Sequence, residues 1–415
     1  MRLLVLGHNY APEALGIGPY TTGLAEHFKT RGHDVTVLTS FPHYPTYQWQ
    51  GKAGMYRHEV RGGVVVRRIR VLLPKRRNAV WRVAFDSSVG AGLLVNSIGV
   101  SRPDLVLAVI PTLQTGLVGG LLARYWRVPL ILWVQDLPIE AGLAVGMLQP
   151  GTLQRLGARL ERFVYRSATR IVVIGDRFRA NLLAKGVAQE RISVISNWVR
   201  SEEDGAAEPD PEMRHHLAGS ADAFLVLHTG AMAGKQGLGN VVEASRALAA
   251  DPTIVTVLVG DGPTKGQLVA ARDNLGLANL RILDVQPAKD YSRMLAAADV
   301  LLLNQRRDVV DAVVPSKLLH YMAAGRPIIA AVNETSVAAE LILDARSGVL
   351  VPPEDPAQLA DAIRNVRADL ELRSRLGANG KAYASQNFAQ AGIMERWDRL
   401  IADTVSSASE TAPHL

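Results

Sequence analysis

Short apolar runs alternate with amphipathic stretches along the whole of this 415-residue chain. In the first half, stretches between the apolar runs carry hydrophobic residues at helical spacing, as Leu24, Ala25 and Phe28 do before Gly32. The apolar runs themselves have the length and composition of buried strands, and they lie at 3–8, 34–40, 63–71, 105–111, 129–136, 170–175 and 193–199. This alternation of strands and helices predicts a doubly wound parallel sheet.

A second series of the same kind begins after residue 223, with expected strands at 224–230, 253–262, 280–285, 299–304, 326–331 and 348–353. Between the two series, the acidic and Pro/Gly-rich stretch 201–212 has no periodicity and is predicted to be a linker. A chain of this length is too long for one core. We therefore expect an α/β fold of two doubly wound (Rossmann-like) parallel-sheet domains, which face each other across a cleft. Ligands in such folds bind at the carboxyl ends of the strands. The expected domains are residues 1–200 and 201–385, followed by a helix at 386–405 and a disordered tail at 406–415.

The stretch 105–123 carries no charge and is almost long enough to span a bilayer. Pro111, Thr112 and Gln114 interrupt it, so a strand, a turn and a helix are the better interpretation. The N-terminus runs directly into a strand-like segment, which predicts no signal peptide. The absence of cysteine excludes disulfides and thiolate chemistry and fits a cytoplasmic protein.

The charge is distributed unevenly, because residues 1–200 contain 26 Lys and Arg against 11 Asp and Glu, whereas the remainder is acidic. The segment Arg67–Arg82 is basic throughout, has no acidic residue, and includes the apolar side chains of Leu72, Leu73, Val80 and Trp81. This composition predicts docking on an anionic membrane surface. A solvated basic face is the simpler alternative. No nucleic-acid-binding motif accompanies the charge, so no nucleic acid partner is expected.

The segment 309–331 combines a loop, a helix and an apolar strand. Pro315 suits the start of a helix, Ser316 is a fair N-cap, and Lys317 follows directly. Free amides at a helix N-terminus together with an ammonium group are suited to a diphosphate. The alternative is an ordinary capped helix with a solvated lysine.

The loop after the expected strand 224–230 contains Gly230 and Lys235 and precedes a helix, which also suits a phosphate. Asp261, in the following VGDGP turn, is a candidate ligand contact, although a turn residue is the more ordinary interpretation. There is no Asp-x-Asp motif and the histidines are scattered, so no catalytic metal is expected.

The loop after the first strand contains Gly16 and Gly18 ahead of a helix, which allows close approach of a phosphate or a sugar. Its spacing is not that of a dinucleotide fingerprint, so a nicotinamide enzyme is disfavoured. His43 ends the second strand in an aromatic segment, TSFPHYPTYQW, suited either to stacking on sugars or to packing of the loop itself.

Two carboxylates follow the strand at 129–136. Asp136 ends the strand and Glu140 lies one helical turn further along. Either could orient a substrate hydroxyl or act as a base. The alternative for Asp136 is a helix-capping role.

With these residues assembled, the chain resembles GT-B glycosyltransferases of the family 4 type, in particular the colanic-acid and O-antigen fucosyl- and N-acetylfucosaminyl-transferase-like enzymes. The resemblance covers nearly the whole chain and rests on five motifs: NYAPEALGIGPYTTGLAEHF, LWVQDLPIEAG, GAMAGKQGL, LVGDGP and VVPSKLLHYMAAGRPIIA. It implies retaining transfer of a sugar from a nucleotide diphosphate without a metal or other cofactor. The first half would take the acceptor and the second half the nucleotide, and the helix 386–405 would cross back to the first domain. Val285 and Leu318 complete the candidate nucleotide-binding set of the second half.

Several positions depart from the family pattern. Two glutamates usual in the family are replaced by Ala312 and His320, the usual Arg and Lys of the phosphate loop by Ala231 and Gln236, and a usual His by Gln135. We infer that Lys235 and Lys317 supply the positive charge at the diphosphate. His320 is expected to reach the ribose or the donor sugar.

These inferences together predict transfer of a hexose, deoxyhexose or N-acetylhexosamine from a UDP- or GDP-sugar to a polyprenyl-diphosphate-linked saccharide. The enzyme would be cytoplasmic and associated with the inner face of the membrane. A nucleotide-sugar 2-epimerase of the same architecture is one alternative. A non-catalytic nucleotide-sugar-binding protein, suggested by the missing glutamates, is another.

Overall fold

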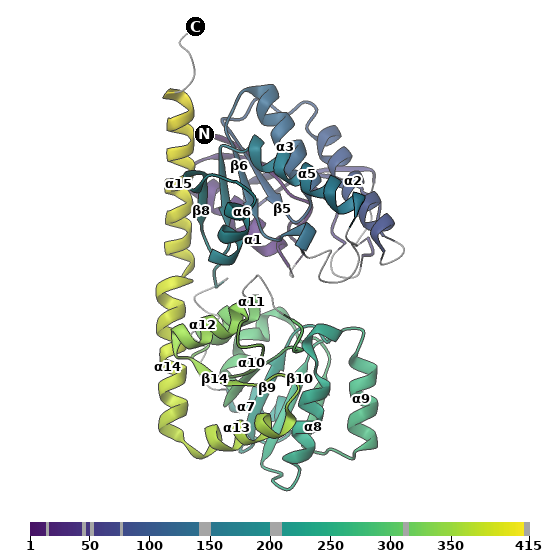
Figure 1. The fold of residues 1–415 in the computed structure, drawn as a ribbon, viewed down its shortest axis with the longest axis vertical. Coiled ribbons are helices and arrows are strands. Elements are labelled where there is room, and N and C mark those ends of the chain that lie inside the picture. The colour runs from purple at the N-terminus through teal and green to yellow at the C-terminus, as the bar shows by residue number, and fades with distance from the viewer. Residues whose placement is uncertain are drawn as a thin grey trace. The chain divides into compact units, whose positions relative to one another are not determined.

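The chain folds into two compact units, each with its own parallel sheet (Figure 1). The computed structural model describes residues 1–13, 16–43, 47–49, 54–74, 78–140, 151–199, 210–309 and 315–410. Unit 1 consists of Met1–Ser196 with Ile393–Leu415, and unit 2 of Asn197–Gly392. The predicted linker at 201–212 follows this division, and its first nine residues lie outside the described part of the chain.

The sheet of unit 1 has eight strands in the order β3-β4-β2-β1-β5-β6-β7-β8. Neighbouring strands are parallel except for β3, which runs antiparallel to β4. The strands are β1 (Arg2–Leu6), β2 (Asp34–Ser40), β3 (Tyr56–Arg61), β4 (Val64–Ile69), β5 (Leu105–Ile110), β6 (Leu130–Val134), β7 (Arg170–Val173) and β8 (Ile192–Val194).

The edge strand β3 was not predicted from the sequence. Its residues, YRHEVR, are polar and mostly exposed, so they lack the apolar pattern by which the other strands are found. A two-residue turn joins it to β4, in which Gly62 and Gly63 have φ values of 54° and 76°. Such values favour glycine, and they give the two-residue hairpin its sharp reversal.

The helices of unit 1 are α1 (Gly18–Thr30), α2 (Ala79–Asn96), α3 (Leu113–Trp126), α5 (Thr152–Ser167) and α6 (Asp176–Ala184), with a short 3₁₀ helix at Gln189–Arg191. Helices α2, α3 and α5 pack side by side (Figure 1). Glycines bring α3 close to its neighbours: a Cβ at Gly119 would lie 2.8 Å from the Cβ of Ala108 on β5. The strand, turn and helix predicted over the uncharged stretch 105–123 are therefore confirmed. Among the described residues, no helix is long and apolar enough to cross a membrane.

The sheet of unit 2 has six parallel strands in the order β11-β10-β9-β12-β13-β14. Both faces are buried, because successive residues of β12 alternate between two hydrophobic clusters, with Leu301 and Leu303 in one and Val300 and Leu302 in the other. The strands are β9 (Phe224–Thr229), β10 (Ile254–Val259), β11 (Leu280–Leu283), β12 (Val300–Asn304), β13 (Ile328–Ala331) and β14 (Gly348–Val351).

The helices of unit 2 complete a second doubly wound arrangement, which confirms the predicted fold class of two Rossmann-like α/β domains. They are α7 (Pro211–Ala218), α8 (Gly239–Ala247), α9 (Lys265–Asn274), α10 (Tyr291–Ala297), α11 (Ser316–Ala323), α12 (Val337–Ala345), α13 (Pro356–Ala368) and α14 (Leu370–Asn387). Two short 3₁₀ helices, η3 (Gly234–Gln236) and η4 (Ala288–Asp290), lie in loops.

The last helix, α15 (Gln390–Glu410), belongs to unit 1 from Ile393 onward. Its Trp397 is fully buried, and the ring lies 5.0 Å from that of Trp133 on β6, centroid to centroid. Asp398 accepts a hydrogen bond of 2.9 Å from the imidazole of His27 on α1. The helix continues to Glu410, so the tail predicted to be disordered over 406–415 is helical as far as that residue.

One arginine of the basic segment Arg67–Arg82 is buried and cannot contribute to the predicted membrane-docking surface, which otherwise stays a prediction. Arg68 lies on β4 with its side chain in the core, where it pairs with Glu59 at 2.8 Å and donates to the carbonyl of Ser40 at 3.2 Å. Arg82 lies in the first turn of a separate element, α2, and pairs with Asp86 at 3.0 Å. Residues 75–77 lie outside the described part.

Candidate active site

Helix α11 of unit 2 begins at Ser316, with Pro315 as its N-cap. The prediction that Ser316 is the N-cap is therefore wrong, because Ser316 is the first helical residue and no side chain caps the first turn. The amide of Leu318 donates to the carbonyl of Pro315 at 2.8 Å, and the Leu318 side chain is buried in the core. The start of α11 therefore offers a ligand its first backbone amides and the side chain of Lys317.

Lys317 is held by a buried histidine that the sequence analysis did not identify. Its Nζ lies 3.4 Å from Nε2 of His228, and Nδ1 of His228 lies 3.0 Å from the carbonyl oxygen of Leu302. Burial, and next the charge of Lys317, hold the pKa of His228 well below its usual 6.5, so the ring is neutral. With its single proton donated from Nδ1 to Leu302, Nε2 can only accept. Lys317 is thus the donor of this pair.

No carboxylate of the described residues forms an ion pair with Lys317. Burial, and next the charge of Lys235, lower the pKa of Lys317 from 10.5 to about 7. A partly desolvated ammonium beside a second lysine is stabilised when an anion binds between them. The two lysines predicted to carry positive charge therefore act on one place in unit 2.

The loop between β9 and α8 forms another side of the candidate anion site at Lys317 and Lys235. A Cβ at Gly230 would lie 3.4 Å from the Nζ of Lys317, and Gly230 has a φ of 111°. Lys235 is exposed on η3. The neighbouring Gln236 is buried, and its carbonyl accepts a hydrogen bond of 2.6 Å from Asn304 at the end of β12. Asn304 thereby anchors the loop to the sheet.

The turn after β10 packs against the same loop. A Cβ at Gly260 would lie 1.9 Å from the carbonyl oxygen of Gly230, so this contact requires glycine. Asp261 is exposed, and its carboxylate accepts a hydrogen bond of 2.8 Å from the amide of Gly262. This contact is that of a turn residue. Val285, after β11, is largely exposed.

His320 lies on α11, one turn after Lys317, and is buried. Its ring packs edge-on against Tyr291 of α10 at 5.6 Å between centroids. The next residue, Tyr321, accepts a hydrogen bond of 2.9 Å from the amide of Thr229 at the end of β9. These aromatic residues fix α11 against the strand that carries His228. Ala312, the position of the other missing glutamate, lies outside the described residues.

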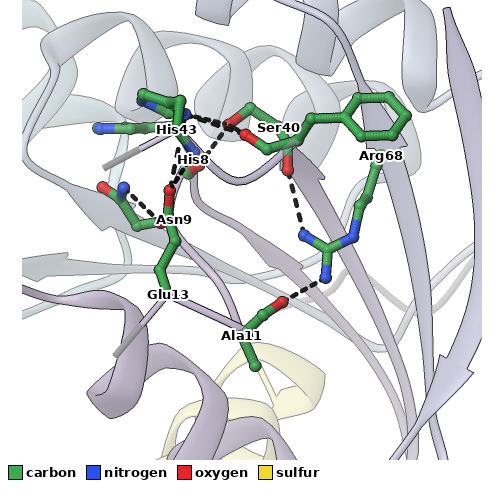
Figure 2. Close-up of polar contacts among 8 residues, drawn as sticks. His8, Asn9, Ala11, Glu13, Ser40, His43 and Arg68 are labelled. Atoms are coloured by element: carbon green, nitrogen blue, oxygen red, sulfur yellow. Dashed lines mark hydrogen bonds and ion pairs between the residues drawn. The ribbon is translucent and has the colours of Figure 1, made fainter. Parts of the chain in front are cut away.

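In unit 1, a buried carboxylate that the sequence analysis missed joins the loops after β1 and β2 (Figure 2). Glu13 accepts hydrogen bonds of 2.7 Å from the amide of His43 and 2.7 Å from the side chain of Asn9. Gly18 lies close beside it, since a Cβ there would make a tight contact of 3.0 Å with the Glu13 carbonyl oxygen. Gly16 is exposed and has a φ of 67°. Glu13 thus joins the loop after β1 to the backbone of His43.

The imidazole of His43 is enclosed by other rings. It lies between 5.6 and 6.1 Å, centroid to centroid, from His8, Phe85, Tyr47 and Trp49. Its Nδ1 lies 2.9 Å from the carbonyl oxygen of Phe41, and the residue is buried. The aromatic residues after β2 therefore pack on one another, which was the alternative to sugar stacking.

Charged groups also lie near the carboxyl ends of β5 and β6. Asp136 is half-buried and accepts the amide of Leu137 at 2.9 Å. Arg82 donates a hydrogen bond to the carbonyl of Pro111 at 3.3 Å. The negative charge of Asp136 is among the interactions that raise the pKa of Arg82. Burial raises the pKa of Asp86, the ion-pair partner of Arg82, to about 6. Asp136 is thus placed near a cation at the edge of the sheet where ligands bind in such folds.

Glu140, the second predicted carboxylate, belongs to a different cluster. It pairs with Lys185 of unit 1 at 2.7 Å and accepts from Asn181 at 3.1 Å, and Lys185 also pairs with the buried Glu161 at 2.7 Å. Burial alone would raise the pKa of Glu140, but the hydrogen bonds from Lys185 and Asn181 lower it. A carboxylate held in this way is a poor base.

A comparison of two substitutions distinguishes a structural role of Glu140 from a catalytic role of Asp136. We expect Glu140→Gln to lower the free energy of unfolding by about 1–2 kcal/mol while kcat stays within roughly threefold of the wild type. Asp136→Asn should instead lower kcat by about a hundredfold at unchanged stability. Thermal unfolding measures the stability of each variant, and initial rates measure its kcat. A hundredfold loss of kcat in Glu140→Gln at unchanged melting temperature would contradict the bracing role.

No group of three or more His, Asp or Glu side chains within the described ranges is arranged to hold a metal ion.

Comparisons with known proteins agree with this architecture. Residues 16–198 match the glycosyl transferase 4-like domain, and residues 210–383 match the glycosyl transferases group 1. A protein of Escherichia coli (strain K12), described as a colanic acid biosynthesis glycosyl transferase, WcaI, is 31% identical over 337 residues. That match covers 78% of this chain and 82% of WcaI. The lipopolysaccharide core biosynthesis glycosyltransferase LpsD of Rhizobium meliloti (strain 1021) is 28% identical over 59% of this chain and 67% of its own length.

Solved structures show the same fold at low sequence identity. Anabaena HepE in complex with UDP is similar with a TM-score of 0.69 and 19% identity, over 98% of this chain and all of HepE. WaaG, a glycosyltransferase involved in lipopolysaccharide biosynthesis, is similar with a TM-score of 0.65 and 18% identity, over 96% of this chain and 99% of WaaG. The two domain matches, the relative at 31% identity and the two Rossmann-like units agree. The chain therefore belongs to the GT-B glycosyltransferases, with a glycosyl transferase 4-like domain followed by a group 1 domain.

Proposed function

We propose that this glycosyltransferase moves a hexose, deoxyhexose or N-acetylhexosamine from a UDP- or GDP-sugar to a polyprenyl-diphosphate-linked saccharide. The observation that carries the proposal is the pair of lysines in unit 2, with Lys317 held by the neutral His228 at the start of α11. Two cations at the first amides of a helix, with no carboxylate of the described residues paired to Lys317, suit a diphosphate. The similarity to HepE, solved with UDP, supports a nucleotide donor.

The residues of unit 2 would act on the leaving group. As the bond between the anomeric carbon and the diphosphate oxygen breaks, negative charge grows on that oxygen. Lys317, Lys235 and the first amides of α11 would stabilise it, an effect often worth several kcal/mol. The acceptor hydroxyl would attack from the face that the diphosphate leaves, with retention, and its proton would pass to the departing diphosphate.

The residues of unit 1 would hold the acceptor. Asp136, just after β6, would orient the attacking hydroxyl, with Arg82 nearby as a counter-charge. The loop braced by Glu13 would shape the place where the acceptor saccharide lies. A lipid-linked acceptor implies work at the inner face of the cytoplasmic membrane. The similarity to WcaI and LpsD supports a role in cell-surface polysaccharide biosynthesis.

Incubation with UDP- and GDP-sugars and a polyprenyl-diphosphate-linked saccharide tests the proposal. We expect a glycosylated lipid and a stoichiometric nucleoside diphosphate with one of the donors. Conversion of the nucleotide sugar to its epimer without transfer would instead show a 2-epimerase. Binding of every donor without turnover would show a binding protein, and either result would overturn the proposal.

We propose further that the transfer needs no metal ion, because the lysines supply the positive charge that a divalent ion would otherwise bring. Dialysis against a chelator should therefore leave kcat and KM unchanged, and added Mg²⁺ or Mn²⁺ should not raise the rate. The measurement is the initial rate before and after dialysis, with metal content determined on the same samples. A loss of activity that a divalent ion restores would contradict this proposal.

A further inference from the structure

Helix α5 of unit 1 presents an exposed face within the described part of the chain. The helix is amphipathic, and among the arginines of its exposed face stand two large apolar side chains, Leu156 at 60% exposed and Phe163 at 58%. The exposed arginines are Arg155, Arg159, Arg162 and Arg166. Large apolar side chains exposed together among like charges on one helix face are typical of an interaction site.

The charge of this face is not compensated. The only acidic residue of α5, Glu161, is buried, where it pairs with Lys185 at 2.7 Å and accepts from Tyr165 at 3.0 Å. None of the four arginines forms an ion pair with a carboxylate of the described residues. The face therefore carries four positive charges with no neutralising partner on the same helix.

Helix α3 extends the surface. It packs closely on α5, since a Cβ at Gly116 would lie 2.5 Å from Val164 and one at Gly120 would lie 2.7 Å from the hydroxyl of Ser167. Directly after these contacts and one turn further on, α3 exposes two further apolar residues, Leu121 at 47% and Tyr125 at 78%. These line a surface hollow together with Arg124 and Arg127, and α3 contains no acidic residue.

We propose that the exposed faces of α5 and α3 form a docking surface for an anionic lipid membrane. The arginines would contact anionic headgroups, while Leu156, Phe163 and Leu121 would enter the boundary between headgroups and acyl chains, with Tyr125 at headgroup level. The mixture of arginines and apolar side chains on one face favours lipid over nucleic acid, because phosphate contacts alone would need no exposed leucine or phenylalanine. This surface does not include the segment Arg67–Arg82. The proposal does not rest on the transfer reaction.

Sedimentation of the full-length protein with vesicles tests the surface. We expect binding to phosphatidylcholine mixed with phosphatidylglycerol, weak binding to phosphatidylcholine alone, and release by salt. Arg159→Gln/Arg162→Gln/Arg166→Gln should weaken binding about a hundredfold, at roughly a fivefold loss for each arginine. Arg246→Gln/Arg364→Gln/Arg375→Gln, which removes the same charge from exposed positions of unit 2, should leave binding nearly unchanged.

A second pair of variants tests the apolar part. Leu156→Ser/Phe163→Ser should weaken vesicle binding at least tenfold without changing net charge. Thermal unfolding and UDP or GDP binding, which report on the fold and on unit 2, should stay as in the wild type for every variant.

Three results would overturn the assignment. The first is equal binding of neutral and anionic vesicles by the wild type. The second is an equal loss of binding in the arginine variant and its unit 2 control, or in Arg67→Gln/Arg70→Gln. The third is binding of a single-stranded oligonucleotide as tight as that of vesicles, with no effect of Leu156→Ser/Phe163→Ser on either ligand. That last result would assign the surface to nucleic acid.

Discussion

Replacing Lys317 by methionine is expected to lower kcat/KM for sugar transfer by roughly a thousandfold, because the growing charge on the diphosphate loses its closest cation. The same change should weaken binding of the nucleoside diphosphate by about ten- to a hundredfold. Lys289→Met, which removes an exposed lysine of η4 in the same unit, is the matched control and should leave both quantities unchanged.

The Lys317→Met variant should also be more stable than the wild type. In the unfolded chain Lys317 keeps its ordinary pKa of 10.5, whereas in the folded chain burial and Lys235 lower it to about 7. At pH 7 and below, the folded protein therefore carries the full cost of a desolvated charge, and stability rises as the pH increases from 7 towards 10.5. Removing the charge should raise the free energy of unfolding at pH 7 by at least about 1 kcal/mol.

Loss of activity combined with higher stability is the signature of a site residue. Thermal unfolding and steady-state kinetics on the same preparations measure it. A Lys317→Met protein that melts lower than the wild type, or that retains its kcat/KM, would contradict the role assigned to Lys317.

The affinity for a nucleotide sugar should fall as the pH rises above 7. The free protein has Lys317 half-protonated near pH 7, and a bound diphosphate would raise its pKa. Above pH 7 binding must therefore take up a proton, so affinity should fall roughly tenfold per pH unit, and below pH 7 it should be flat. Of the groups that face Lys317, His228 stays neutral over this range because burial lowers its pKa. Burial also raises the pKa of Tyr321 of α11 above the range.

Titration calorimetry in buffers of different ionisation enthalpy measures this uptake. At pH 8 to 9 the wild type should take up close to one proton per nucleotide sugar, and Lys317→Met should take up none. A nucleotide sugar is the right ligand, since its phosphates do not titrate in this range. Affinity of the wild type that is constant from pH 7 to 9 would contradict the linkage.

Much of the fold could be predicted from the sequence because it depends on local periodicity. The runs at 105–111 and 129–136 are continuous and apolar, as strands buried on both faces are, and both are strands in the structure. The edge strand β3 escaped detection because its residues are polar. The buried position of Arg68 could not be predicted either, since its partner Glu59 lies on that unpredicted strand.

The site was predictable where a motif is local and not where it is made by distant residues. The sequence indicates Lys317 by its place at a helix start, whereas its partner His228 is 89 residues away on a strand and resembles any buried histidine. Glu13 gave no signal for the same reason, because its contact with His43 joins two loops. Glu140 was selected by its spacing from Asp136, and only the structure shows Lys185 beside it.

We propose that the N-terminus of α11, with Lys317 and Lys235, binds the diphosphate of the donor. A crystal structure of the protein with UDP or GDP tests it most directly. We expect a phosphate oxygen within about 3 Å of the Nζ of Lys317, close to the first amides of α11 and to Gly230. A diphosphate bound elsewhere, with Lys317 still bonded only to His228, would contradict it.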